Sequence, residues 1–586
     1  MLAAAIRRLL RFRLWLAGLL RAGELPSILF WAGLIGFLGA LISVAFRDCI
    51  TLLQNPLAGE DNDLYLAASR LSPWIKLLLP VAGGACAGLI LQWGIHLGKN
   101  RPSGDYMEAV VVGDGVIPFR TTLVKSISSL CSIASGGSIG REGPMVQLSA
   151  MLASVLGRKQ KVSAPRLRLY VACGAAAGIA SAYNAPIAGA LFVSEIVLGS
   201  IAVESFGPLA FSSVMATVTV HQLMGAKPTY TVPHFQVVSN WEFVFYVLLG
   251  VLTGLVAPIF IRLLREGEEI FRRLNLPLAL KLALGGLVVG VLALQRPEVY
   301  GNGYTVVNSI LWQDWPWAVL LAVLCSKLLA TSATAGSGAV GGLFTPTLFV
   351  GAVSGCLLGK ILHVFQPDFT AGPGAYALIG MGGFLAATTQ APLMAILMIF
   401  EMTLEYSVVL PLMLTCVTAH MVAKSLGQES IYAHHLRQRD FTRILLPVLN
   451  SKVGDLIKPN EASISPITPF GQIAEIFAQH RINYLYVTDE ANRFLGVVSL
   501  HDLKPHLNSP ELSDAIIALD ILKEDFPFLT PDQHVTEALR LFSLHDGERI
   551  PVLNSKTDRK LLGTVSKLDL LLRISEIKAG ADPVPA

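Results

Sequence analysis

Long apolar segments without charge follow one another through most of the 586-residue chain, from about residue 28 to residue 425. Ile28–Phe46 and Phe243–Ile261 are each 19 residues long and contain no Asp, Glu, Lys or Arg. A helix that crosses a bilayer needs about 20 such residues. Charged residues make up only 15% of the chain, against about 25% in a typical soluble protein. The pattern predicts a polytopic, mainly α-helical membrane protein.

Several apolar segments are short and interrupted by Gly or Pro, as around Ala172–Ala182 and Gly380–Thr389. Non-helical backbone at membrane depth is tolerated only where it lines a cavity or is covered by protein. Broken helices at matching places of two halves are typical of a transport site. We therefore expect these interruptions to recur at matching places of an internal repeat.

An internal repeat is present. Asn184–Glu195 aligns without gaps with Gln390–Glu401 at an offset of 206 residues, and Pro144 and Pro346 are 202 residues apart. Lys125 and Lys327 each precede those prolines by 19 residues. We predict two membrane repeats, 28–232 and 233–435. The second is inverted if each contains an odd number of spans.

The glycine-rich run Ser135–Pro144 leads directly into the apolar segment Met145–Leu156. A helix start offers about four unpaired N–H groups and roughly half a positive charge, and glycine permits close approach of a ligand. Such a start binds anions. Glu142 places an anion within that site itself. We interpret Glu142 as a gate that competes with a transported anion.

The first 21 residues contain five arginines and no acidic residue. A signal-peptide n-region is one interpretation, but Arg21 lies where a small-residue cleavage site would be. We favour a basic amphipathic helix over residues 1–27 on the cytoplasmic face. All seven cysteines fall in the membrane part without CxxC spacing, which is typical of small buried apolar residues and indicates no metal site.

The pattern changes after Tyr432. Residues 436–452 are predicted as a linker, and residues from 453 onward alternate between short strands and helices. This part is itself duplicated, because Gly496–Asp502 corresponds to Gly563–Asp569. We predict two small α/β domains, 453–512 and 513–580.

Residues 28–435 resemble the CLC family of chloride channels and chloride/proton exchangers. The resemblance is carried by Gly140–Pro144 (GREGP), Gly342–Pro346 (GLFTP), the Asn-Ala-Pro that begins at Asn184, and Tyr432. The C-terminal part is similar to a tandem pair of CBS domains, which several CLC proteins carry. The resemblance implies an inverted-repeat fold, a homodimer in a bilayer, and one chloride pathway per subunit.

The resemblance also implies site residues. Glu142 matches the family's gating glutamate, and Lys125 matches a buried lysine that raises the positive potential of the pore. The implied anion site consists of Ser103, Gly140, Arg141, Gly143, Leu343, Phe344 and Tyr432.

Alternatives stay open for several of these residues. The competing interpretations are that the Glu142 carboxylate is permanently paired with Arg141, that Tyr432 anchors the chain at the membrane interface, and that Lys125 neutralises Glu142 or snorkels. Ser103 lies in a loop that departs from the family's usual Gly-Ser-Gly-Ile-Pro. Gly113–Pro118 looks closer to that pattern but lies too near Lys125 to align.

One position bears on mechanism. Exchangers of the family usually place a proton-accepting glutamate directly after the position of Glu195, where this chain has Ile196. Ile196 cannot carry a proton, so we predict a passive, Glu142-gated, voltage-gated-type chloride channel. The alternative is a chloride/proton antiporter. Glu195 and its counterpart Glu401 are predicted to be structural.

Two more distant classes were weighed. A CBS-regulated cation transporter would need clustered intramembrane carboxylates as oxygen ligands, and the membrane part has few. An enzyme would need a catalytic constellation, and no Ser/His/Asp set or HExxH motif supports one. We therefore predict that the protein is not an enzyme, needs no cofactor and binds no nucleic acid.

CBS pairs bind adenine nucleotides, often with a Ser/Thr-x-x-Asp motif on the ribose. The possible nucleotide-binding residues are Ser499, Asp502, Ser566 and Asp569. The competing interpretation is an N-cap serine followed by an acidic first turn. The expected location is a bacterial inner membrane with both termini in the cytoplasm.

Overall fold

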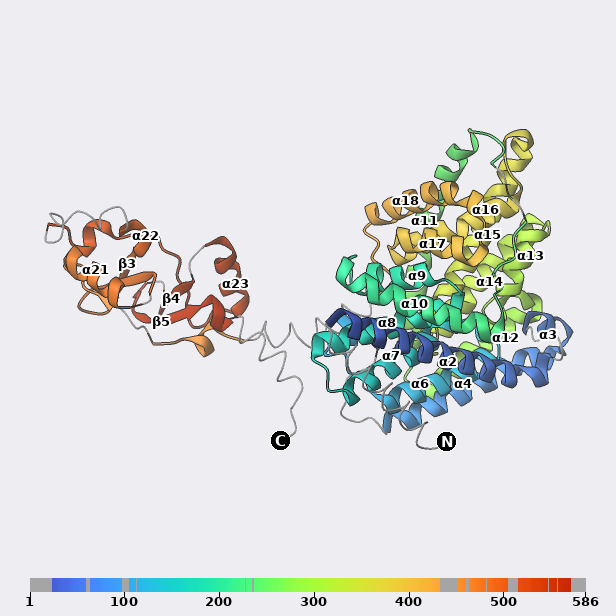
Figure 1. Cartoon of the computed structure of the whole chain (residues 1–586), viewed down its shortest axis with the longest axis horizontal. Helices are drawn as coiled ribbons and strands as arrows, with labels where there is room; N and C mark the ends of the chain where they lie inside the picture. Colours follow the sequence, from blue (N-terminus) through green and yellow to red (C-terminus); the bar gives the residue numbers. More distant parts are fainter. Residues whose placement is uncertain are drawn as a thin grey trace, which may run out of the picture. The chain divides into compact units, whose positions relative to one another are not determined.

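The structure is a computed structural model. It describes residues 24–58, 64–96, 105–111, 113–226, 228–233, 235, 237–432, 451–459, 463–480, 482–503, 515–545, 548–555 and 557–570. The chain divides into two compact units, Met1–His434 and His435–Ala586, and Figure 1 shows a helical first unit and a smaller second unit that contains strands. Most of the predicted N-terminal helix and of the predicted linker lies outside the described residues.

The regular elements of the first unit are all helices among its described residues. Its elements are α2 (Glu24–Ala58), α3 (Leu64–Arg70), α4 (Pro73–His96), α5 (Tyr106–Val111), α6 (Phe119–Ala134), α7 (Glu142–Lys159), α8 (Ala164–Tyr183), α9 (Pro186–Leu191), η2 (Phe192–Val197), α10 (Val203–Met224), α11 (Glu242–Arg273), α12 (Leu278–Gln295), η3 (Pro297–Val299), α13 (Tyr304–Trp312), α14 (Trp317–Gly336), α15 (Phe344–Phe365), η4 (Pro367–Phe369), α16 (Pro373–Thr389), α17 (Pro392–Thr403), η5 (Tyr406–Val408) and α18 (Val409–Ser425).

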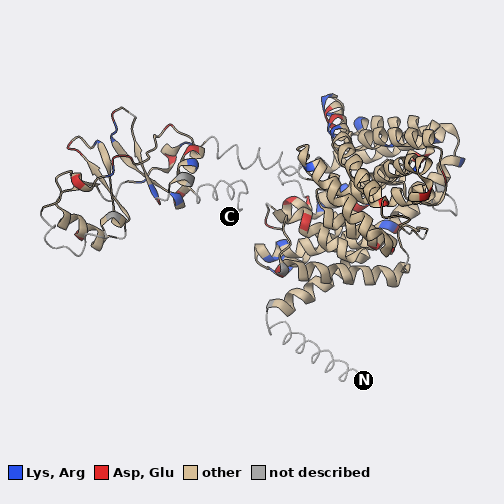
Figure 2. Ribbon diagram, turned by 90° about the horizontal axis from the view of Figure 1, so that it is seen from above, with Lys and Arg blue, Asp and Glu red and all other residues tan. Residues whose placement is uncertain are grey.

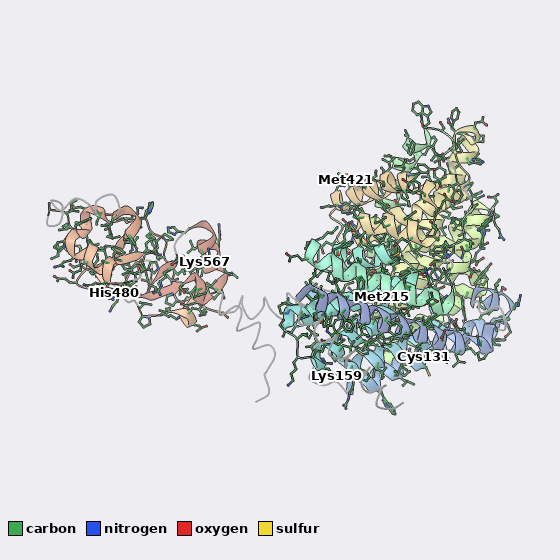
Figure 3. The ribbon with its side chains drawn as sticks, viewed as in Figure 1. Cys131, Lys159, Met215, Met421, His480 and Lys567 are labelled. Atoms are coloured by element: carbon green, nitrogen blue, oxygen red, sulfur yellow. The ribbon has the colours of Figure 1, made fainter. Side chains whose placement is uncertain are left out.

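Within the described residues, seven helical segments are long and apolar enough to cross a membrane. Charged residues, coloured blue and red on the ribbon, are sparse in this unit (Figure 2). Large apolar side chains face outward instead: Trp93 is 81% exposed, and Met421 on α18, labelled in Figure 3, is 65% exposed. An apolar outer surface suits a lipid environment. The prediction of a multi-pass, mainly α-helical membrane protein is confirmed.

Glycines allow the helices around the centre to approach closely. On α15, a Cβ added at Gly355 would lie 2.0 Å from the carbonyl oxygen of Tyr376 on α16. A Cβ at Gly351 would lie 2.6 Å from the carbonyl oxygen of Gly380. Small residues in such crossings let helix backbones pack without intervening side chains. This packing against α16 fixes the position of α15, whose first turn forms part of the site described below.

The internal repeat is visible in the backbone. Asn184 and Gln390 both adopt the left-handed conformation, with φ of 60° and 59°, directly before the Ala-Pro that opens α9 and α17. Gly136 and Gly338 have φ of 95° and 96°, a region that glycine enters without steric penalty. These matched irregularities show that the aligned segments share their local structure as well as their sequence.

The two copies differ after that turn. α17 continues as a regular α-helix, whereas α9 ends at Leu191 and gives way to the π-helix η2. Glu195 and Ile196 both lie in η2. A π-helix has i→i+5 hydrogen bonds and a wider turn.

Each copy also provides a carboxylate that accepts hydrogen bonds from a helix start of the other copy. The backbone N–H groups of residues 187–188, in the first turn of α9, donate to the carboxylate of Glu401 at 2.9 and 2.8 Å. Those of residues 393–394, in the first turn of α17, donate to Glu195 at 3.4 and 2.8 Å. Each carboxylate therefore satisfies unpaired helix-start donors of the other repeat. This exchange of caps agrees with the structural role predicted for both residues.

The second unit contains two small sheets. β1 (Ser463–Ile464) pairs parallel with β2 (Tyr484–Thr488), β2 pairs antiparallel with β3 (Phe494–Ser499), and β4 (Arg549–Leu553) pairs antiparallel with β5 (Leu561–Ser566). The helical elements are η7 (Val453–Leu456), α21 (Phe470–Gln479), α22 (Leu500–Leu503), η10 (Ala518–Ile521) and α23 (Val535–Leu544). The predicted small α/β part is confirmed.

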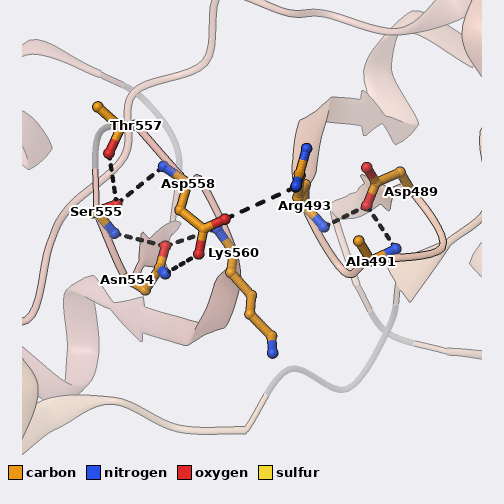
Figure 4. A network of polar contacts seen from close by, with 8 residues as sticks. All are labelled: Asp489, Ala491, Arg493, Asn554, Ser555, Thr557, Asp558 and Lys560. Carbon is orange, nitrogen blue, oxygen red and sulfur yellow. Dashed lines mark hydrogen bonds and ion pairs between the residues drawn. The ribbon is translucent and has the colours of Figure 1, made fainter.

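The two hairpins of this unit meet at their turns. Asn492 and Arg559 occupy matching left-handed positions, with φ of 59° and 51°. Asp489 accepts hydrogen bonds from the backbone of its own turn, and Arg493 lies 3.9 Å from the carboxylate of Asp558 on the other turn (Figure 4). Duplicated hairpins that contact through equivalent turns indicate a pair of related domains packed together.

Candidate functional site

The two glycine-rich runs meet in the first unit. Gly140, before α7, and Gly342, before α15, form an isolated antiparallel bridge with N–H···O distances of 2.8 Å in both directions. A Cβ at Gly143 would lie 3.1 Å from the backbone of Gly341. The bridge places the first turns of α7 and α15 side by side, although they are about two hundred residues apart in sequence.

The carboxylate of Glu142 lies at the start of α15. Its two oxygens accept hydrogen bonds from the backbone N–H of Thr345 at 3.0 Å and from the Thr345 hydroxyl at 3.1 Å. Glu142 is only 3% exposed. An anion at this place is stabilised by unpaired donors and by the helix dipole. A carboxylate of the chain itself thus occupies a position where a free anion would bind.

Glycines leave room for this carboxylate. A Cβ at Gly140 would come within 2.1 Å of the Glu142 carboxylate oxygens, and one at Gly342 would come within 2.4 Å. Any larger residue would displace the carboxylate. The glycines of both motifs therefore shape the volume that the Glu142 side chain fills.

Arg141 does not pair with Glu142. Among the described residues no ion pair within 4.0 Å joins them, and the Arg141 guanidinium lies over the ring of Tyr304, 5.4 Å from its centroid. The alternative of a permanently paired carboxylate is not supported. Hydroxyl groups lie near the carboxylate instead, because those of Tyr183 and Tyr304 are 3.2 and 3.4 Å from the Thr345 hydroxyl that donates to Glu142.

Aromatic rings pack beside the start of α15. Phe344 is buried, and its ring centroid lies 4.7 Å from that of Tyr183 and 6.4 Å from that of Phe192. Tyr432 contacts Phe192 edge-to-face at 5.7 Å and packs with Leu343 against the same core. A membrane-interface anchor does not fit this internal packing. Leu343, Phe344 and Tyr432 are brought together, and their role in anion binding stays a prediction.

Other predicted residues lie elsewhere. Ser103 is outside the described residues. Lys125 lies on α6 and is partly buried, which leaves its electrostatic role a prediction. Its repeat counterpart Lys327 is fully buried, donates to the carbonyl oxygens of residues 299 and 301 at 3.1 and 2.8 Å, and lies over the ring of Phe349. Lys327 therefore holds the loop that precedes α13.

Sequence reasoning missed the hydroxyl groups around Glu142. Thr345 lies within the GLFTP motif, so a hydroxyl in a helix's first turn was available as a signal. Tyr183 directly precedes Asn184, but nothing in its spacing indicated contact with Thr345. Tyr304 lies in a segment to which the sequence analysis gave no role.

In the second unit the serines cap short helices. The Ser566 hydroxyl accepts the backbone N–H of Asp569 at 3.0 Å, and the Ser499 hydroxyl accepts that of His501 at 3.1 Å. The side chain of Asp502 is outside the description. Lys458 donates to the Asp569 carboxylate at 2.7 Å, and this hydrogen bond is the main reason why the pKa of Asp569 is lowered. The capping interpretation is thus observed at both serines.

Fold and site together define an integral-membrane protein built from two related repeats whose glycine-rich runs meet at a buried carboxylate. Residues 83–424 match the model of the voltage gated chloride channel family, and residues 453–508 and 517–576 match the CBS domain. The chain therefore belongs to the voltage gated chloride channel (CLC) family and carries tandem CBS domains. The resemblance drawn from GREGP and GLFTP is confirmed.

Among individual relatives, a ClcB-like protein of Ralstonia nicotianae is 54% identical over 421 residues, which is 71% of this chain and 98% of the relative. The voltage-gated ClC-type chloride channel ClcB of Salmonella dublin is 42% identical over 410 residues, 69% of this chain and 97% of the relative.

The chain is also similar to solved structures, among them the following two. A slow cyanobacterial Cl⁻/H⁺ antiporter has a TM-score of 0.62 and 27% identity, and the match covers 70% of this chain and 97% of the antiporter. A eukaryotic CLC transporter has a TM-score of 0.57 and covers 93% of this chain and 98% of its own. At 21% identity the second likeness concerns the fold alone.

Proposed function

We propose that the protein carries chloride across the membrane in exchange for protons, with Glu142 as the shared site of both ions. The supporting observation is the Glu142 carboxylate at the start of α15. A carboxylate and a chloride ion cannot fill one position together, so chloride enters only when the carboxylate leaves. Protonation removes the negative charge that holds the carboxylate there. Proton uptake and chloride entry are then linked at one residue.

This proposal reverses the preference for a passive channel. A channel was predicted from the sequence because Ile196 cannot carry a proton. The comparisons favour the alternative, since a solved structure at 27% identity is a Cl⁻/H⁺ antiporter. Exchange in this chain then requires a proton route to Glu142 that does not use residue 196. A Glu142-gated channel is the second candidate, and Ile196 is the observation that favours it.

The reversal potential separates the two candidates. With purified protein in planar bilayers under a pH gradient and equal chloride on both sides, exchange is expected to shift the reversal potential away from zero, because protons contribute to the driving force. A chloride gradient should also drive protons uphill in liposomes. A reversal potential that stays at zero would assign the protein to the channel class.

Membrane orientation and assembly form part of the proposal. Arg158 and Lys159 end α7, and basic residues concentrate on the cytoplasmic side. The Glu142 end of α7 then faces outward, and both chain termini face the cytoplasm of a bacterial inner membrane. We further propose a homodimer with one pathway in each subunit, as the family resemblance implies.

Cation transport is the least supported class. Each of the three membrane carboxylates considered, Glu142, Glu195 and Glu401, accepts hydrogen bonds from backbone N–H groups at a helix start. Such positions carry positive potential. A carboxylate whose lone pairs already face N–H donors is poorly arranged to coordinate a cation.

The CBS pair is proposed to bind an adenine nucleotide. Ser499 and Ser566 each end a strand directly before a helical turn, where a hydroxyl can reach a ribose diol. Because Lys458 already donates a hydrogen bond to Asp569, a ribose would have to displace the Lys458 amine from that carboxylate. We expect Lys458→Ala to tighten nucleotide binding, as measured by calorimetric titration of the full-length protein with ATP, ADP and AMP. The absence of heat with all three nucleotides, in both proteins, would exclude the nucleotide site.

A further inference from the structure

A cavity of about 490 Å³ lies beside the gate. It is lined by the end of α2, by Arg141 before α7, by the ends of α8 and α10, and by residues 300–305 before and within α13. Tyr304 belongs both to this lining and to the hydroxyl cluster around Glu142. The cavity is therefore the space directly next to the closed gate, and its size is that of a small-molecule site.

Two guanidinium groups line the cavity, and neither forms an ion pair within 4.0 Å among the described residues. Arg47 comes from α2 and Arg141 from the loop before α7, and no Asp or Glu is found among the described lining residues. Unpaired basic groups at one cavity raise its positive potential. The arrangement favours an anionic occupant with more than one charge.

Most donors of these guanidinium groups are unused. Each group has five N–H donors. Among the described residues, the hydrogen bond of Arg47 goes to the Met224 sulfur at 3.5 Å, a weak acceptor. The Nε of Arg141 is buried and has no hydrogen-bond partner in the part of the chain that the structure describes. That Nε is closed off from solvent, so an anion in the cavity would be bound by the terminal nitrogens of Arg141.

We propose that the cavity is a binding site for a small dicarboxylate, held by Arg47 and Arg141, which slows chloride transport by covering the gate. The forked guanidinium matches a carboxylate in two parallel hydrogen bonds. One carboxylate would satisfy Arg141, and the second would satisfy Arg47. This inference rests on the proposed transport function for its effect on flux, though not for binding.

The lining favours a dicarboxylate over a monatomic or inorganic anion. Ile50, Ile133, Val220 and Met224 contribute apolar surface to the same cavity. A carbon skeleton between two carboxylates can contact that surface, whereas sulfate cannot. A halide ion can accept donors from one arginine but leaves most of the cavity empty. The cavity thus combines the two features that a short dicarboxylate needs.

Binding is tested with purified full-length protein and malonate by isothermal titration calorimetry. We expect wild-type protein to bind malonate, and to bind propionate and sulfate more weakly. Arg47→Gln should weaken malonate binding at least about tenfold, because it removes a charge-assisted bidentate contact. Arg47→Lys keeps the charge but loses the fork, so an intermediate loss is expected. Arg158→Gln, at the exposed opposite end of α7, should bind as wild type.

Flux is measured on the same preparations in liposomes with malonate on both sides, each variant normalised to its own malonate-free rate. Malonate should slow wild-type chloride efflux, and Arg47→Gln should shift the half-inhibitory concentration upward by at least about tenfold.

Absence of malonate binding, equal binding by wild type and Arg47→Gln, or tighter binding of sulfate than of malonate would overturn the proposal. Arginine-dependent binding in a protein that carries no chloride would uphold the site and refute the transport function.

Discussion

Replacing Glu142 with alanine is expected to free chloride flux from its dependence on pH and to abolish coupled proton movement. The carboxylate lies at the start of α15 and accepts two hydrogen bonds from Thr345. A hydrogen bond to a charged group contributes about 1.5–3 kcal/mol. Alanine can neither fill that position nor carry a proton. An anion would then reach the α15 donors at any pH. We expect the ratio between the fastest and the slowest chloride efflux rates over the pH range to fall at least about tenfold.

The measurement is chloride efflux from liposomes over a range of pH, combined with proton movement under a chloride gradient. Glu142→Gln tests charge at constant size and should resemble the alanine variant. Glu204→Ala removes an exposed carboxylate on α10 and should behave as wild type. If Glu142→Ala keeps both its pH dependence and its proton coupling, Glu142 is not the gate.

Gly355→Leu is expected to prevent stable folding of the helical unit. Its Cβ would lie 2.0 Å from the Tyr376 carbonyl oxygen, and a backbone atom cannot move aside as a side chain can. Overpacking of a core typically costs about 1–3 kcal/mol, and the cost is higher where two helix backbones must separate. Loss of this crossing would also release α15 and the anion position at its start.

Fluorescence-detected size exclusion of detergent-solubilised protein after heating gives the measurement. We expect Gly355→Leu to aggregate at temperatures where wild type stays monodisperse. Gly207→Leu is the matched control, because Gly207 lies in α10 with nothing within 4 Å of an added Cβ. Equal stability of the two leucine variants would mean that the α15–α16 contact contributes little to folding.

Much of the fold could be predicted from patterns local to the chain. Charge-free segments of bilayer length predicted the membrane spans, and the repeated Ala-Pro segments predicted the two related halves. The left-handed Asn184 and Gln390 agree with that alignment down to single residues. Such features depend on residues near one another in sequence, so a single sequence carries them.

Contacts between the halves could not be predicted in the same way. Glu142 and Thr345 are separated by 203 residues, and no periodicity links them. The π-helix η2 was missed because one extra residue in a turn leaves an apolar pattern almost unchanged. Ile196 shows only that one position lacks a side chain that can carry a proton. A proton route can also use water molecules, which the amino-acid sequence does not reveal.

The exchanged caps of Glu195 and Glu401 restrict how the protein can move while it works. Any rocking that separates α9 from α17 would break four N–H···carboxylate hydrogen bonds together, at a cost of about 6 kcal/mol or more. A free-energy difference of that size leaves the separated arrangement populated at about one part in ten thousand or less. Glu195 and Glu401 therefore tie the first turns of α9 and α17 together, and most of the population keeps the two repeats joined at these two caps.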